Sequence, residues 1–330
     1  MNYSRPLFVT LTLAALLGGC AKSKQDVVVP PCDCPSLTAP PANMVLGPYQ
    51  TRSRRYYALP CFNPSNPREI AYAKSDADNP TEDGLYMANL DTRQQRPIYL
   101  HRGPTLQLHW STTGWLALSM NDQVWKIKAN GDSLTQLTTG GFHYLPQWSP
   151  DGQRLVCREP DSPGAPLIII DKNGRWLTQL SGFPVNYCQG WSPDGTRLLI
   201  TYGPLANEQG YGVGVYDLAT NQAQLIVDTQ VPNNSSGMLT GAAWLPDSRN
   251  VVWAAGTGIY TTDTQTRETK QLHTGCDTRV YLNPDVSADG RTILVRRIDR
   301  KSLDEGKGVY QESNLWLMDI DGRNERKIVF

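Results

Sequence analysis

The chain has 330 residues, and its 31 lysines and arginines balance its 31 aspartates and glutamates, so the formal net charge is zero. A neutral chain without a basic run lacks the cationic surface that nucleic-acid binding requires, and we expect no nucleic-acid partner. Its 24 prolines and 28 glycines are spread along the sequence, a composition typical of many short strands joined by turns rather than of a helical protein.

The first 19 residues predict a signal peptide. Arg5 precedes an apolar run from Leu7 to Leu17, which is too short to span a bilayer and has the length of a signal-peptide core. The run ends in Leu17-Gly18-Gly19-Cys20, which resembles the lipobox of bacterial lipoproteins. The resemblance implies cleavage before Cys20 and acylation of that cysteine, so that the only membrane contact is a lipid anchor. An ordinary secretory signal with an unrelated cysteine is the alternative.

Residues 20–43 predict a tether. The segment contains five prolines and few large apolar side chains, so it cannot bury enough surface to fold. Ala21, rather than an aspartate, follows the cysteine, which indicates an outer-membrane lipoprotein of the cell envelope. We expect the folded domain to occupy residues 44–330.

Six copies of one short pattern occupy that domain. Two copies read Trp-Ser-Pro-Asp-Gly, at 148–152 and 191–195, and a third reads Val-Ser-Ala-Asp-Gly at 286–290. A weaker copy begins at Trp244, and degraded copies begin at Trp110 and Phe62. The large apolar residue that opens each copy, which we call the marker residue, therefore stands at positions 62, 110, 148, 191, 244 and 286. The spacing between successive marker residues matches the length of sequence that forms one propeller blade.

The pattern also predicts the strands of each unit. The marker residue ends a first strand, and Pro-Asp-Gly forms a tight turn because glycine adopts positive φ without strain. In the third unit, Arg154–Cys157, Leu167–Ile170 and Leu177–Leu180 are the next strands, and a second polar turn at 171–174 joins the last two. A comparable turn follows the third strand of every unit. The predicted fold is an all-β, six-bladed β-propeller of four-stranded antiparallel blades; a β-sandwich with chance hairpins is the alternative.

The Trp-Ser-Pro-Asp-Gly turn followed by an apolar strand resembles the TolB-like family of WD-type propeller repeats, over about residues 56–330. The resemblance is specific in the third, fourth and sixth units and loose in the first two. It implies the propeller fold and periplasmic protein partners. TolB itself carries a separate domain ahead of its propeller, where this chain has the short tether. The stretch Met44–Gln50 is a candidate for a strand that closes the ring.

Six cysteines remain besides Cys20, and fifteen full pairings are open to them in an oxidising compartment. Cys61 and Cys188 lie in opposite units, too far apart for a disulfide, so we expect them not to pair. A bond from Cys32 or Cys34 to the propeller stays open. The spacing Cys32-Asp33-Cys34 does not fit a zinc site.

Long second-to-third loops and blade-to-blade links gather at one end of the predicted propeller, where binding sites usually lie. Aromatic and arginine side chains serve as interface anchors. The candidate partner-binding residues in these links are His143, Tyr144, Tyr187, Arg279 and Tyr281. Packing between blades is the alternative role for each of them.

Catalytic motifs are missing from the sequence. It contains no Gly-x-Ser-x-Gly and no His-Glu-x-x-His, and no glycine-rich phosphate loop fits. His109 and His143 come from neighbouring links, but catalytic metals usually take three protein ligands. We therefore expect no catalytic residue, no metal and no cofactor. The predicted function is a non-enzymatic envelope lipoprotein that binds a protein or peptide at its loop-rich channel face. The alternative is a carbohydrate-binding protein, or a lyase- or hydrolase-type enzyme, that uses the same channel mouth.

Overall fold

The computed structural model describes residues 45–46, 50–52, 55–102, 106–159, 167–180, 187–202, 211–229, 239–276, 278–302 and 309–330, which all belong to one compact unit. The predicted signal peptide, Cys20 and the tether lie outside these residues, so they remain predictions. Within the described segments, no helix has the length and apolar character needed to cross a membrane.

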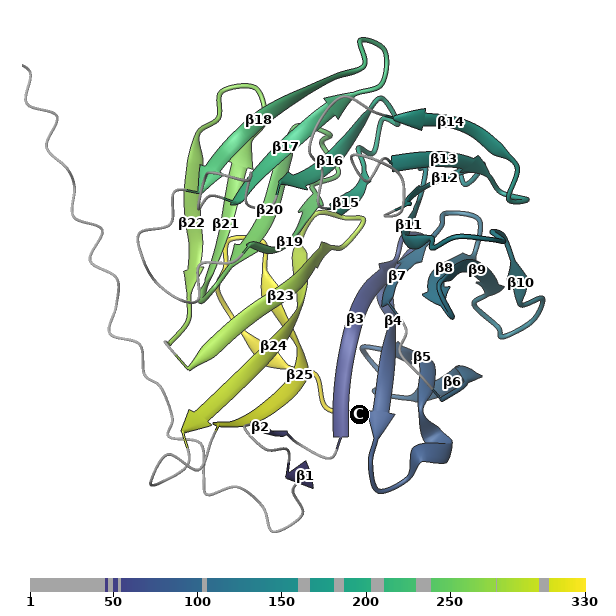
Figure 1. Cartoon of the computed structure of the whole chain (residues 1–330). Helices are drawn as coiled ribbons and strands as arrows, with labels where there is room; N and C mark the ends of the chain where they lie inside the picture. Colours follow the sequence, from purple (N-terminus) through teal and green to yellow (C-terminus); the bar gives the residue numbers. More distant parts are fainter. Residues whose placement is uncertain are drawn as a thin grey trace, which may run out of the picture. The chain divides into compact units, whose positions relative to one another are not determined.

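Six antiparallel sheets follow one another along the chain and stand side by side as the blades of a six-bladed β-propeller (Figure 1). The first three blades are β3 (Arg55–Asn63), β4 (Asn66–Asp76), β5 (Gly84–Asn89) and β6 (Gln95–Leu100); β7 (Leu106–Trp110), β8 (Trp115–Met120), β9 (Gln123–Lys128) and β10 (Thr135–Gln136); and β11 (Tyr144–Trp148), β12 (Arg154–Arg158), β13 (Leu167–Asp171) and β14 (Trp176–Leu180).

The remaining three blades repeat this arrangement, and a single short 3-10 helix, η1 (Pro80–Glu82), lies in the first blade among the described residues. These blades are β15 (Tyr187–Trp191), β16 (Arg197–Tyr202), β17 (Tyr211–Asp217) and β18 (Gln222–Thr229); β19 (Leu239–Trp244), β20 (Asn250–Ala255), β21 (Gly258–Asp263) and β22 (Thr269–Thr274); and β23 (Arg279–Val286), β24 (Thr292–Ser302), β25 (Val309–Asp319) and β26 (Arg326–Lys327). The predicted six-bladed fold is confirmed.

The predicted turn after the first strand is held by its own side chains. In the third blade, the backbone N–H of Arg154 donates to Ser149 Oγ (2.9 Å), and Ser149 Oγ donates to Asp151 Oδ1 (2.5 Å). Gly152 closes the turn with φ of +65°. The fourth and sixth blades repeat these contacts at Ser192 and Ser287. The repeated sequence therefore builds the same hairpin each time, independently of the rest of the molecule.

The second turn of a blade touches the blade before it. In the turn between β13 and β14, Gly174 has φ of +89°, and a Cβ atom there would overlap the carbonyl oxygen of Leu137, which follows β10 of the preceding blade. Gly131 and Gly322 lie in the same way against the carbonyl oxygens of Ile98 and Leu272. The glycine is thus required by contact between blades as well as by its backbone angle.

Gly174→Ala is expected to destabilise the protein more than Gly140→Ala does. Both glycines have positive φ (+89° and +70°), but no atom lies within 4 Å of a Cβ built on Gly140. The backbone strain alone costs about 1–2 kcal/mol at either site, and the overlap at Gly174 adds about 1–3 kcal/mol. Urea unfolding of the two variants measures the difference, and equal losses would contradict the inter-blade contact.

The ring closes through the sixth blade. Strand β26 pairs with one end of β25 in antiparallel fashion, and β2 (Gln50–Arg52) pairs in parallel with the other end, opposite Val309–Gln311. Strand β1 (Val45–Leu46) pairs with β2. The two ends of the domain therefore share one strand edge, which protects that edge from other pairings.

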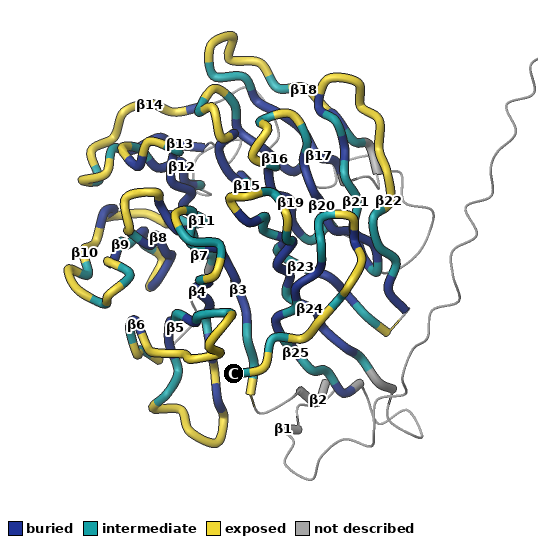
Figure 2. The backbone as a smooth tube through the Cα atoms, turned by 180° about the vertical axis from the view of Figure 1, so that it is seen from behind, coloured by how far each residue is buried: buried dark blue, intermediate teal, exposed yellow. Residues whose placement is uncertain are grey.

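The core lies between neighbouring blades. Each cluster of buried apolar side chains combines two adjacent blades; one joins Tyr72 and Phe62 of the first blade to Leu315 of the sixth. Figure 2 shows burial in the inner and middle strands and exposure in the outermost strands and turns. The marker tryptophans pack between neighbouring blades. For example, Arg154 of the third blade stacks on the Trp191 ring of the fourth (4.8 Å).

The pairing of the cysteines can be compared with the prediction for the described residues. Cys61, Cys157 and Cys188 are buried and free, which confirms that Cys61 and Cys188 do not pair. Cys276 is disulfide-bonded, and the other half of that bond lies outside the described residues. The bond between the propeller and Cys32 or Cys34 stays a prediction.

Candidate binding site

Every inner strand has an irregularity shortly before its marker residue. The pairing between the first and second strands shifts register there in all six blades, as between Tyr144 and Gln147 in the third blade and between Leu282 and Asp285 in the sixth. Gln107, Leu145 and Asn283 have positive φ at these places. A bulge of this kind re-aims side chains, here into the space enclosed by the inner strands.

A cavity of about 360 Å³ lies there, and all six blades contribute to it. Its wall consists of the ends of the inner strands and the first residues of the turns that follow, so it lies toward the tight-turn side of the propeller. We call it the axial cavity. Its polar side chains just before the markers are Gln107, His109, Gln147, Gln189, Asn283 and Asp285, and its rim residues two positions after the markers are Pro64, Thr112, Pro150, Pro193, Pro246 and Ala288.

Three of the polar side chains join one blade to the next. The backbone N–H of Trp148 donates to His109 Nδ1 (3.0 Å), that of Ala242 to Gln189 Oε1 (3.3 Å), and that of Phe62 to Asp285 Oδ2 (2.7 Å). Because His109 Nδ1 accepts, its neutral ring carries the proton on Nε2. Burial lowers the pKa of His109 to about 4, so the ring is neutral at physiological pH.

One side chain of the axial cavity lacks the hydrogen-bond partners that burial ordinarily demands, and another carries a charge with no cation among the lining residues. Gln147 is 1% exposed, and neither its carboxamide oxygen nor its nitrogen makes a hydrogen bond within the described protein. Burial raises the pKa of Asp285 to about 6, and no lysine or arginine is among the residues that line the cavity. Buried amides are usually hydrogen-bonded and carboxylates withdrawn from water are usually paired, so these two groups make the axial cavity a candidate ligand site.

The five residues expected to bind a partner do not form one surface. Tyr281 is fully buried, where its hydroxyl donates to Glu325 Oε1 (2.9 Å) and lies 3.0 Å from His273 Nε2. His143 is also buried, with Nε2 3.7 Å from a carboxylate oxygen of Glu159. Inter-blade packing therefore leaves these two rings little or no surface for a partner.

The other three candidates are spread over the loop-rich side. Tyr187 is 46% exposed with Arg158 over its ring (5.5 Å), and the half-buried Tyr144 donates to Asp122 Oδ1 (3.1 Å). Arg279, in the sixth blade, is largely buried beside Asp299 (3.4 Å). A partner-binding role for Tyr144, Tyr187 and Arg279 stays a prediction.

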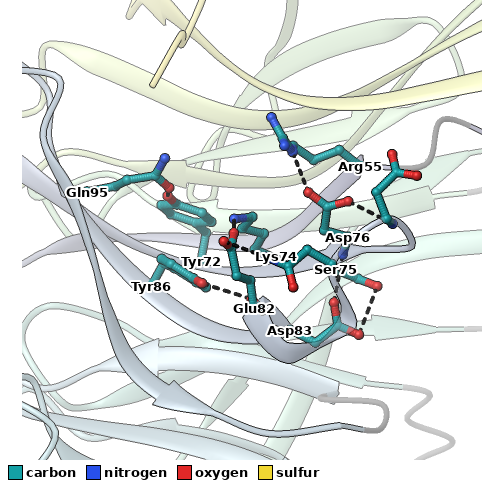
Figure 3. Close-up of polar contacts among 11 residues, drawn as sticks. Arg55, Tyr72, Lys74, Ser75, Asp76, Glu82, Asp83, Tyr86 and Gln95 are labelled. Atoms are coloured by element: carbon teal, nitrogen blue, oxygen red, sulfur yellow. Dashed lines mark hydrogen bonds and ion pairs between the residues drawn. The ribbon is translucent and has the colours of Figure 1, made fainter.

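The loop between β4 and β5 is predicted to be part of that binding face, but its polar side chains are engaged in contacts with one another and with the adjoining strands. Figure 3 shows its polar side chains turned toward one another. The buried Lys74 pairs with Glu82 Oε2 (2.5 Å), Arg55 Nε donates to Asp76 Oδ2 (2.8 Å), and the backbone N–H of Asp76 donates to Asp83 Oδ1 (2.7 Å). This internal network satisfies the charges that a partner would otherwise contact.

The sequence interpretation did not single out Gln147 or Asp285. The sequence does contain a pattern that could have identified them. In three units the position just before the marker residue is polar: His109, Gln147 and Asp285. A buried inner strand is expected to be apolar there. Within the described segments, no three His, Cys, Asp or Glu side chains come together as a metal-binding group.

The fold defines the class of protein: a six-bladed β-propeller, here with a cavity lined by all six blades. No family model matches the chain, and no curated protein matches it. Solved structures do. A putative TolB from Agrobacterium tumefaciens is 20% identical, with a TM-score of 0.58, over 74% of this chain and 87% of its own.

TolB from Acinetobacter baumannii is 18% identical, with a TM-score of 0.54, over 68% of this chain and 56% of its own length. An oligogalacturonate lyase in complex with manganese is 11% identical, with a TM-score of 0.51, over 71% of this chain and 72% of its own. Likenesses at these identities show the shared propeller fold. The predicted resemblance to TolB is thereby supported at the level of the fold.

Proposed function

We propose that this protein is a non-enzymatic lipoprotein of the cell envelope whose propeller binds a protein or peptide partner, a segment of which enters the axial cavity. The observation that carries the proposal is the buried, unpartnered carboxamide of Gln147 in a cavity walled by tryptophan and proline. A mostly apolar pocket with a few convergent polar groups is the usual form of a binding site. The envelope location rests on the lipobox-like Leu17–Cys20 segment.

The titratable groups of the cavity support binding rather than catalysis. Burial raises the pKa of the Cys61 thiol well above its ordinary value, so Cys61 is a poor nucleophile. The acceptor atom of His109 is already occupied by the Trp148 N–H. Asp285 is the one carboxylate of the lining, without the second acid or base that hydrolysis or elimination needs.

Carbohydrate binding is less well supported. An acidic sugar would meet the Asp285 carboxylate and no lysine or arginine among the lining residues. Neutral sugars commonly stack on exposed aromatic faces, but the lining tryptophans are only 2–8% exposed and pack between blades. A polypeptide, which offers both donors and acceptors, fits the amide-rich wall better.

Site-specific photo-crosslinking of the full-length protein in envelopes tests this proposal. A photoreactive residue in place of Thr112, on the exposed rim, is expected to crosslink a discrete protein partner, whereas one in place of Tyr187, on the loop-rich side, is not. Gln147→Leu should abolish the crosslink, because it replaces the cavity amide by an apolar side chain of similar size. The exposed Gln265→Leu is the matched control. A partner that crosslinks only from position 187 would assign binding to the loop-rich side instead.

A further inference from the structure

Asp285 is a partly buried carboxylate with no lysine or arginine beside it among the lining residues. It ends the bulge of β23, and its Oδ2 accepts the Phe62 N–H from the first blade. No lysine or arginine lines the axial cavity around it. A carboxylate withdrawn from water ordinarily has a cation near it, so Asp285 offers a charge that a cationic ligand can pair with.

The rest of the axial cavity fits a cationic guest. Gln147 supplies a carboxamide oxygen with no hydrogen-bond donor from the described protein. Gly190 stands beside it, and a Cβ atom there would make an ordinary van der Waals contact of 3.7 Å with that oxygen. The rim is uncharged, with four prolines among its six positions, so nothing at the entrance repels a cation.

We propose that the axial cavity binds the ammonium or guanidinium group of a lysine or arginine side chain of a peptide, with the Asp285 carboxylate as countercharge. This inference rests on the proposed function and names the chemistry of the group that enters the site. A charge-assisted hydrogen bond to Asp285 is the interaction that would distinguish such a side chain from an apolar one of equal length.

A metal ion fits the same groups less well. Calcium takes six to eight oxygen ligands, usually including several carboxylates, and magnesium demands a near-octahedral set. The lining of the axial cavity offers one carboxylate, Asp285, besides neutral amides. An ammonium group needs only two or three acceptors and no fixed coordination geometry, so a single carboxylate beside neutral amides suits it better than a metal ion.

The same site predicts a pH dependence. The other titratable groups of the cavity lining are Cys61 on β3 and His109 on β7; burial keeps the Cys61 thiol protonated, and the pKa of His109 is lowered to about 4. Asp285, with its pKa raised to about 6, is therefore the group of the lining that changes charge between about pH 5 and pH 7.5. Protonation removes the countercharge, so affinity for a cation should fall in acid.

Four short peptides test the inference: acetyl-Gly-Gly-Xaa-Gly-Gly-amide with lysine, arginine, norleucine or glutamate at Xaa, titrated calorimetrically into the full-length protein. At about pH 7.5, the lysine and arginine peptides should bind at least about tenfold more tightly than norleucine, and glutamate most weakly. Asp285→Asn should erase the preference. Asp321→Asn, an exposed carboxylate of the same blade, should leave it unchanged. At about pH 5 the preference should fall about tenfold.

Several results would overturn the inference. Equal binding of the lysine and norleucine peptides, a preference that survives Asp285→Asn, or no binding of any peptide at millimolar concentration would each do so. Binding of calcium or manganese chloride alone that depends on Asp285 would assign the site to a metal. If the crosslink from position 112 persists in any of these cases, the peptide-binding function stands and only its charge preference fails.

Discussion

Replacement of Arg297 by methionine is expected to lower the free energy of unfolding by about 3–5 kcal/mol, because it leaves two buried carboxylates short of their main cation. Arg297, on β24, is 5% exposed and pairs with Glu325 Oε1 (2.9 Å) and Asp299 Oδ1 (3.0 Å). Its guanidinium also stacks on Trp316, 3.2 Å from the ring centroid. Methionine keeps the length of the aliphatic stem, so the loss reports the charge and its hydrogen bonds.

The cluster around Arg297 joins the fifth and sixth blades. Glu325 also accepts from Tyr281, and His273 of the fifth blade approaches both of them. In the variant, Arg279 remains near the two carboxylates, at 3.4 Å from Asp299 and 3.9 Å from Glu325. The loss of one cation should therefore loosen the packing of one blade on the next.

Arg323→Met is the matched control for Arg297→Met. Arg323 is 83% exposed, and its ion pair with Asp321 (3.7 Å) is open to solvent. Exposed pairs contribute about 0–1 kcal/mol, so this variant should unfold close to wild type in urea. Similar losses in the two variants would contradict a special contribution from the buried cluster.

Asp285→Asn is expected to stabilise the protein above about pH 6 and to change little near pH 4. The folded-state pKa of Asp285 is raised to about 6, above the unfolded value near 3.9, so the folded protein holds its proton more tightly. Ionisation therefore reduces stability progressively between about pH 4 and pH 6, by about 1–3 kcal/mol in total, and the reduction stays constant above that range. Asparagine keeps an oxygen for the Phe62 N–H and has no charge to bury.

The measurement is urea unfolding of wild type and Asp285→Asn at several pH values. His109 has the opposite sign, because its folded pKa of about 4 lies below the unfolded value near 6.5 and its contribution is lost as the pH falls. That contribution is present in both proteins and cancels in the difference. A difference that does not vary with pH would contradict a raised pKa of Asp285 in the folded protein.

Asp285→Asn is expected to have opposite effects on stability and on binding. The variant should gain stability and lose its preference for cationic peptides. A residue that lowers stability where it stands is commonly kept for function, and such trade-offs concentrate at binding sites. Gain in stability together with loss of cationic binding would identify Asp285 as part of the site rather than of the scaffold.

The number of blades, the order of strands within each blade and both sets of turns could be predicted from local sequence patterns. These features are local: Ser149, Asp151 and Gly152 hold their turn through contacts within a few residues, and the same letters repeat at Ser192 and Ser287. A turn motif of this kind forms the same structure wherever it occurs, so reading it required no knowledge of the other blades.

The tertiary structure alone decided where the blades meet and what their meeting encloses. Gln147 and Asp285 come from blades far apart in sequence, and only closure of the ring brings them to one cavity. Tyr281 looked like a binding residue and is buried between blades, because its ring and hydroxyl are taken up by His273 and Glu325. Packing between blades depends on long-range contacts that no local pattern encodes, and the axial cavity is a product of that packing.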